Sequence, residues 1–194
     1  MANRSYLYAT DTVPGQEPAG ATAERVGLSE WPYVIPLTHA ILVSVDTAQC
    51  PSTIWEGERA VAFVGDYEGG LARLKVFLGQ VAAPAAQPLI REAVAFLELA
   101  ANRRKYILLE VQEIFEMDDD PEAQGTIFAA GLASLDDDIA LELAGLPPVP
   151  ASVVPGFLAR LFGQAGPAPS PVDAGVVETG EEWGLGEWSN HLYY

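Results

Sequence analysis

Carboxylates directly after a buried strand are the side chains of this sequence best placed to do chemistry. The stretch from Arg59 to Phe77 begins with an apolar run, Ala60 to Val64, which is typical of a strand buried on both faces. Asp66, Tyr67 and Glu68 follow at once, and a helical pattern then continues to the end of the stretch. A turn between a strand and a helix often carries functional groups in α/β proteins, so these three residues form one hypothetical ligand site.

A structural interpretation of the same turn is the simpler one. Asp66 is a good helix N-cap, and Glu68 favours the positive end of a helix dipole. Neither GxGxxG nor GxxxxGK[ST] aligns with the glycines between Gly65 and Gly70, which we expect to loosen the backbone. His191 would join the site if the C-terminal residues cross the strand ends.

Two aspartate triplets suggest oxygen ligands, but their pattern favours other roles. They consist of Asp118, Asp119, Asp120, Asp136, Asp137 and Asp138. Neither triplet fits the calcium-binding loop pattern D-x-[DN]-x-[DN]-G-x₅-E. Asp120 is followed by Pro121, a pair typical of a helix start, and Ser134 is a candidate N-cap for the next helix. We therefore predict no metal site and no cofactor, and interpret both triplets as part of a protein-binding surface.

The charge is unevenly distributed along the chain. The net charge is −17, from 27 acidic and 10 basic side chains. Residues 1–105 carry 11 acidic and 9 basic side chains, whereas residues 106–194 carry 16 acidic side chains and only Arg160. A negative field of this kind repels nucleic acid and anionic membranes and attracts basic proteins. The sequence thus predicts a basic protein as partner, with solubility alone as the alternative.

Nucleophilic and membrane functions find little support. No GxSxG elbow is present, and His39 lies in an apolar segment where a core role is the simpler interpretation. Cys50, the single cysteine, excludes an internal disulfide and favours a reducing cytoplasm. No run of about 18 apolar residues predicts a membrane span, and the first residues lack the apolar region of a signal peptide. We predict no catalytic residue and a cytoplasmic location.

The elements that must position these residues alternate irregularly between strand and helix patterns. Strands are predicted over 4–9, 60–65 and 106–115, and helices over 36–45, 89–101, 121–131, 135–144 and 152–162. The segment 36–45 also fits a strand, and 102–105 places three positive charges where they would favour a helix C-terminus. No regular βαβ repeat enforces a parallel sheet. The pattern therefore predicts a single α+β domain with a small central β-sheet packed by helices.

Composition divides the chain into three parts. Residues 1–162 form the α+β domain, and 163–182 form a flexible linker rich in Gly and Pro. Residues 183–194 contain several aromatic side chains, which disordered tails usually lack. We expect this C-terminal segment to fold back on the domain, beside the strand 4–9.

Four stretches carry a resemblance to a known family. They are MANRSYLY at the N-terminus, SEWPYVIP, AFVGDYEGG, and WGLGEWSNHLYY at the C-terminus. Together they resemble a bacterial protein family of unassigned function, which implies a bacterial cytoplasmic protein and transfers no catalytic residue. By size and charge the chain is similar to immunity proteins of toxin systems. Our leading hypothesis is a non-enzymatic acidic protein-binding module, immunity-like or regulatory. The alternative is a small-molecule- or metal-binding enzyme that uses the Gly65–Gly70 turn.

Overall fold

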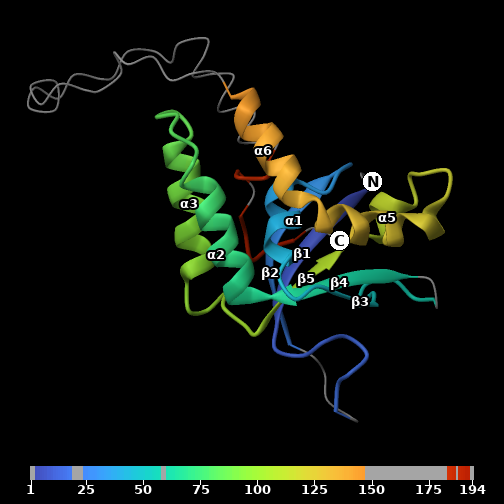
Figure 1. Ribbon diagram of the computed structural model, residues 1–194. Coiled ribbons are helices and arrows are strands. Elements are labelled where there is room, and N and C mark those ends of the chain that lie inside the picture. The colour runs from blue at the N-terminus through green and yellow to red at the C-terminus, as the bar shows by residue number, and fades with distance from the viewer. Residues whose placement is uncertain (1–2, 19–23, 58–59, 147–182, 187, 193–194) are drawn as a thin grey trace, which may run out of the picture.

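The core of the molecule is a five-stranded antiparallel sheet (Figure 1). The computed structural model describes residues 3–18, 24–57, 60–146, 183–186 and 188–192. Its strands are β1 (Arg4–Thr10), β2 (Arg25–Pro32), β3 (Ala48–Pro51), β4 (Val61–Asp66) and β5 (Tyr106–Glu110), in the order β2-β1-β5-β4-β3. Together with the helices, this sheet confirms the predicted α+β domain.

The strands form where apolar residues alternate or run together. In β1, Tyr6 and Tyr8 belong to the cluster on one face, while Leu7 belongs to the cluster on the other. In β4, Phe63 and its neighbours are buried on both faces of the sheet, as the apolar run predicted.

Three features of the sheet differ from the sequence prediction. Strands β2 and β3 were not predicted. β2 contains Gly27, whose pair with Tyr8 lies next to a register shift, and β3 is only four residues long. The strand predicted over 106–115 ends at Glu110, and α4 (Gln112–Phe115) follows it. The apolar side chains after Glu110 pack into the core from a helical turn rather than from a strand.

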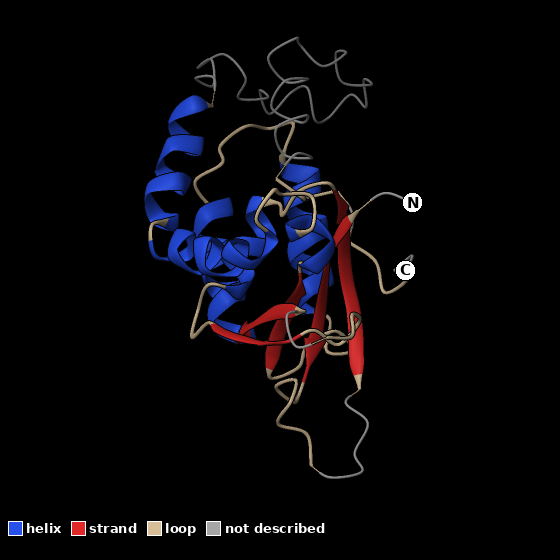
Figure 2. Cartoon of the chain, turned by 90° about the vertical axis from the view of Figure 1, so that its right-hand side faces the viewer, coloured by secondary structure: helices blue, strands red, loops and turns tan. Residues whose placement is uncertain are grey.

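The helices lie on one side of the sheet (Figure 2), and their buried side chains belong to the main core cluster. Besides α4 they are α1 (Leu37–Val43), α2 (Tyr67–Leu78), α3 (Gln87–Glu98), α5 (Pro121–Ala133) and α6 (Leu135–Gly145). Leu7, Phe63 and Leu109 of the sheet belong to the same cluster as these helices. The opposite face carries a smaller cluster, against which Val13 and Ile54 of two loops are packed.

Some of the predicted helix starts have the expected capping residue, and one does not. Residues 37–43 form the helix that Pro36 predicted, so the alternative strand is wrong. Asp120 caps α5 by accepting from the backbone N–H of Ala123 at 3.3 Å. Ser134 does not cap α6 with its side chain, because its hydroxyl donates to the carbonyl oxygen of Gly131 instead.

Glycine at two positions permits close packing of α1 against β4 and α2. A Cβ atom at Gly65 would lie 2.3 Å from the carbonyl oxygen of Val43, and one at Gly70 would lie 1.9 Å from that of Leu42. Neither glycine has a positive φ angle. The prediction that these glycines loosen a turn is therefore wrong, since they lie in regular structure and admit neighbouring backbone.

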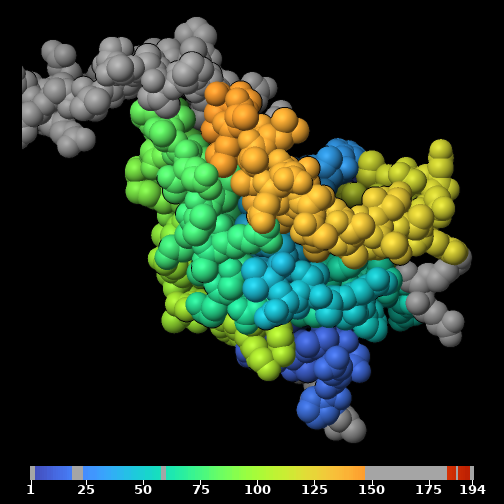
Figure 3. All heavy atoms as spheres, in the orientation of Figure 1, coloured from blue at the N-terminus to red at the C-terminus, as the bar shows by residue number. Residues whose placement is uncertain are grey.

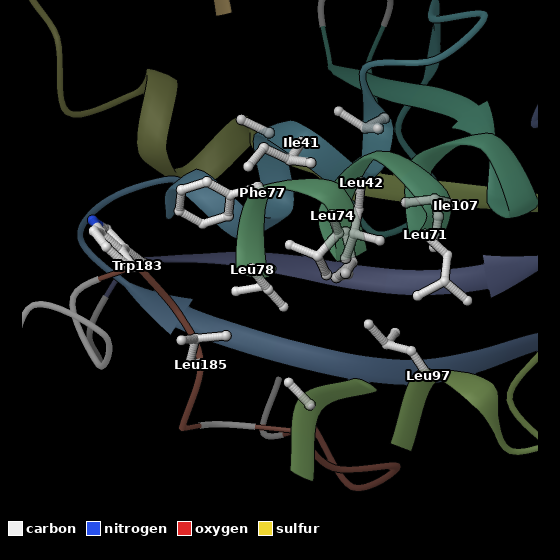
Figure 4. Packing of buried hydrophobic residues seen from close by; sticks show 14 of the residues in the cluster. Ile41, Leu42, Leu71, Leu74, Phe77, Leu78, Leu97, Ile107, Trp183 and Leu185 are labelled. Carbon is white, nitrogen blue, oxygen red and sulfur yellow. The ribbon is translucent and has the colours of Figure 1, made fainter. Parts of the chain in front are cut away.

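The C-terminal segment runs from the helix-covered face to the edge of the sheet. Trp183 and Leu185 are buried in the main cluster. Figure 4 shows Trp183 beside Phe77 of α2. Trp188 then forms an isolated antiparallel bridge with Ser29 of β2. This contact is on β2, the edge strand, and not on β1 as the sequence suggested. The predicted helix 152–162 and linker 163–182 lie outside the described residues.

Candidate functional site

The hypothetical ligand site after β4 consists of residues with structural partners. The Asp66 carboxylate accepts from the backbone N–H of Gly69 at 2.7 Å and so caps α2. Tyr67 is fully buried, its hydroxyl donates to the carbonyl oxygen of Leu97 at 2.9 Å, and burial raises its pKa to about 12. Glu68 forms an ion pair with Arg103. The structural interpretation therefore accounts for all three side chains.

The charged groups of the basic residues that follow α3 are engaged mainly by side chains of other segments. α3 ends at Glu98, before the segment 102–105. Arg103 pairs with Glu68, and Arg104 lies 3.6 Å from a carboxylate oxygen of Asp11. Lys105 lies over the Tyr106 ring, 4.8 Å from its centroid. The predicted role at the helix C-terminus is thus replaced by tertiary ion pairs and a cation–π contact.

His191 is not brought to the turn after β4 by any contact of the described residues. It is exposed, and its backbone N–H donates to the Ser189 hydroxyl at 3.0 Å. The neighbouring Asn190 side chain donates to the carbonyl oxygen of Gly27 and to the Asn102 side chain. These bonds hold the segment against β2 and Asn102, and the described residues record no contact between His191 and Asp66, Tyr67 or Glu68.

A serine–histidine pair with the residue types of a catalytic dyad lies in the core, away from solvent. His39 Nε2 lies 3.0 Å from the Ser29 hydroxyl, and both residues are fully buried. Burial lowers the pKa of His39 to about 3, which keeps the ring neutral. Its ring also packs edge-on to Trp188 at 6.3 Å. The pair joins α1 to β2 and offers no route for a substrate, in line with the predicted core role.

A buried carboxylate on the opposite face is also a structural group. Glu110 accepts from the Ser52 hydroxyl and from both the backbone N–H and the hydroxyl of Thr53, at 2.6–2.7 Å. Burial, assisted by the charge of Glu110, raises the pKa of the Cys50 thiol to about 12. A protonated, buried thiol is a poor nucleophile. Among the described residues, no group of His, Cys, Asp and Glu side chains could hold a metal ion.

The acidic stretch from residue 110 to residue 142 is divided between the interior and the surface. Glu110 is buried, and Glu113 accepts from the backbone N–H of Arg4 and the hydroxyl of Tyr6. Glu142 accepts from the Trp183 indole N–H at 3.0 Å. All three carboxylates have partners within the fold, and only Glu142 among them is exposed, so the acidic stretch does not form one continuous contact surface.

The two aspartate triplets lie at opposite ends of α5. Asp118, Asp119 and Asp120 are all exposed on the turn before α5, and we call these three residues the acidic corner. The triplet Asp136–Asp138 opens α6, where Asp136 pairs with Arg73 and all three carboxylates favour the helix dipole. The second triplet is therefore explained by the fold. In the acidic corner only Asp120 has a comparable role, as the N-cap of α5.

An apolar groove borders the acidic corner. Its volume is about 390 Å³, and we call it the α5 groove; its lining residues are Tyr33, Val34, Ile35, Ile114, Phe115, Met117, Asp118, Gln124, Ile127 and Phe128. Asp118 belongs to both the groove and the corner. Figure 3 shows α5 in yellow at the side of the molecule, beside the blue surface of the loop that precedes α1.

A second, larger hollow of about 660 Å³ lies on the other side of the same turn. Trp55 and Glu56 line it on one side, and Glu116 and Glu122 on the other. Gly57 and Ala60 also line it. The turn that holds the acidic corner thus separates two hollows, and the α5 groove is the one that Asp118 of the corner lines.

Sequence reasoning missed the α5 groove because its walls are far apart in the chain. Tyr33 follows β2, whereas Met117 and Ile127 come more than eighty residues later. One signal was available: residues 123–133 contain no charged side chain and are too apolar for an ordinary exposed helix.

The fold and the groove together define a class of protein. It is a single α+β domain with helices on one face of an antiparallel sheet, and its most distinctive surface is an apolar groove beside carboxylates. A family model described as a domain of unknown function (DUF7822) matches residues 11–149. The chain therefore belongs to the DUF7822 family. No curated protein and no solved structure matches it.

Proposed function

We propose that this protein is a non-enzymatic bacterial cytoplasmic module that binds a basic protein through the acidic corner and the α5 groove. The observation that carries the proposal is the position of Asp118, which is exposed in the corner and also lines the groove. A partner can thereby meet negative charge and apolar surface in one contact, the combination typical of protein interfaces.

Charge supports the proposal over a role in solubility alone. The acidic corner lies in a chain of net charge −17, and mutual repulsion of this kind lowers folding stability. A basic partner would relieve the repulsion and would be attracted over about 10 Å at 0.1 M salt. The alternative enzyme or ligand site after β4 has less support, since Asp66, Tyr67 and Glu68 are engaged in the fold.

No helix of the described residues has both the length and the apolar character needed to cross a membrane.

The experiment compares two charge-matched variants in capture of a basic partner from the source cell. Asp118→Asn with Asp119→Asn neutralises the acidic corner, and Asp137→Asn with Asp138→Asn removes the same charge from α6. Asparagine at 118 still offers the oxygen that accepts from the backbone N–H of Asp120. We expect the corner variant to capture less of the partner and to associate with it about tenfold more slowly at low salt. Equal capture by both variants would reduce the corner to a solubilising surface.

A further inference from the structure

Resting on the proposed function, we propose that the partner presents an amphipathic segment, with apolar side chains in the α5 groove and Lys or Arg against the acidic corner. This partner is more specific than a basic protein in general, because a partner attracted by charge alone would make no use of the apolar groove.

Exposed apolar side chains of the described residues gather at the groove. Eight large hydrophobic residues among them are strongly exposed, and four of the eight line it: Tyr33, Val34, Met117 and Ile127. Single exposed hydrophobics are ordinary on protein surfaces, but a cluster beside polar residues marks an interaction site. The gathering therefore points to a surface that another apolar group covers.

Helix α5 lacks the burial that its composition requires. Only Gly125 is buried in α5, although the helix has no charged residue after Glu122. A helix that is apolar all round is normally buried on all sides. Ile127, on the exposed part of α5, forms one wall of the groove and is 57% exposed. The missing packing layer is the place for the partner's apolar side chains.

The groove is built on a rigid base. The ring of Phe128 packs against Phe63 at 4.9 Å and against Phe115 at 6.3 Å between centroids. On the opposite wall, Tyr33 has a φ angle of +66° and is 58% exposed, while its backbone N–H is held by the carbonyl oxygen of Asn3. Such a conformation is unfavourable for a tyrosine and clusters at functional sites. A preformed groove of this kind lowers the ordering cost of binding.

Charge selects the partner over a second copy of this chain. Asp118 lines the groove, and Lys and Arg are absent from the groove's described lining. A second copy seated there would bring another net charge of −17 to an acidic surface. An amphipathic basic segment instead satisfies both features, as when a helix lays its apolar face in a groove.

The test uses synthetic peptides with the full-length protein at physiological ionic strength. One peptide has leucine and lysine at amphipathic helical spacing, and a second replaces leucine by alanine while keeping the charge. Fluorescence anisotropy gives the two dissociation constants. We expect the leucine peptide to bind at least about tenfold tighter, as burial of a single leucine side chain implies.

Variants of the protein locate the leucine contribution. Ile127→Ala with Met117→Ala should abolish the advantage of the leucine peptide. Leu141→Ala is the matched control, because Leu141 is 72% exposed and does not line the groove. Both groove residues are at least half exposed, so thermal melts of all variants should stay close to the wild type.

The outcomes separate this inference from the proposed function. If both peptides bind equally and both need Asp118 and Asp119, binding at the acidic corner stands and the apolar anchor is overturned. If the leucine advantage persists in the Ile127→Ala, Met117→Ala protein, the anchor lies elsewhere and the inference is again overturned. If neither peptide binds, both proposals fail. A wild-type dimer that the groove variant dissociates would assign the groove to a second copy and would overturn the inference.

Discussion

Asp66 shows how one carboxylate fits two interpretations until its partner is known. In the structure it accepts from the backbone N–H of Gly69 at 2.7 Å, the bond of an N-cap. We predict that Asp66→Ala lowers the free energy of unfolding by about 1 kcal/mol, because α2 loses this cap. Urea unfolding measures the change. Asp66→Asn is the control, since asparagine caps nearly as well, and an equal loss in both variants would contradict a simple capping role.

His39 makes the stability depend on pH in a defined window. Its pKa is lowered by burial from 6.5 in the unfolded chain to about 3 in the fold. The unfolded state therefore binds a proton more readily, so stability is fully present above pH 6.5 and is lost as pH falls toward 3.

Substitution isolates the His39 contribution from that of the many carboxylates. We predict that the unfolding midpoint of wild type falls more steeply between pH 6.5 and pH 4 than that of His39→Gln, which cannot be protonated there. Chemical unfolding of both proteins at several pH values measures the difference. Parallel curves would show that His39 is not the titrating group.

At the scale of the elements, Gly70 and Gly131 offer a matched pair of substitutions within helices. A Cβ atom at Gly70 would lie 1.9 Å from the carbonyl oxygen of Leu42, whereas one at Gly131 would meet nothing within 4 Å. We predict that Gly70→Ala lowers the free energy of unfolding by about 1–3 kcal/mol or more, through overpacking. Gly131→Ala should raise it by up to about 1 kcal/mol, through helix propensity. Similar effects of both substitutions in urea unfolding would contradict the close packing of α1 on α2.

Elements with local signals could be predicted from the sequence. The apolar run of β4, Pro36 before α1 and the Asp120-Pro121 pair before α5 act within a few residues, and each element is present. β2 and β3 depend instead on pairing with distant strands, and Pro51 and Gly27 weaken their local patterns. The end of the last strand at Glu110 is likewise set by tertiary contacts of that carboxylate.

The candidate site follows the same distinction. The acidic corner could be predicted from three adjacent aspartates, and its last member, Asp120, acts as the predicted cap. The α5 groove could not, because it forms only where the loop after β2 meets α5. Likewise no local pattern showed that Glu68 pairs with Arg103, which are thirty-five residues apart.

At the scale of the whole molecule, the C-terminal segment is part of the core. Trp183 is 4% exposed, packs 5.2 Å from the Phe77 ring and donates to Glu142. Leu185 is fully buried. We predict that deleting residues 183–194 lowers the melting temperature by many degrees, because two large core side chains are lost and each contributes about 2–5 kcal/mol. An unchanged calorimetric melt would show that the domain does not depend on the segment.

The same segment also determines how the sheet ends. Backbone at Gly27, Leu28 and Ser29 of the edge strand β2 is engaged by residues 188–190. At the other edge, β3 is short and ends at Pro51, which has no N–H to offer a further strand. A bare β2 edge would instead be a template on which a second molecule could add its own strand. By covering this edge, the C-terminal residues are expected to limit aggregation. If they detach, electrostatic repulsion between copies of the acidic chain still opposes fibril growth.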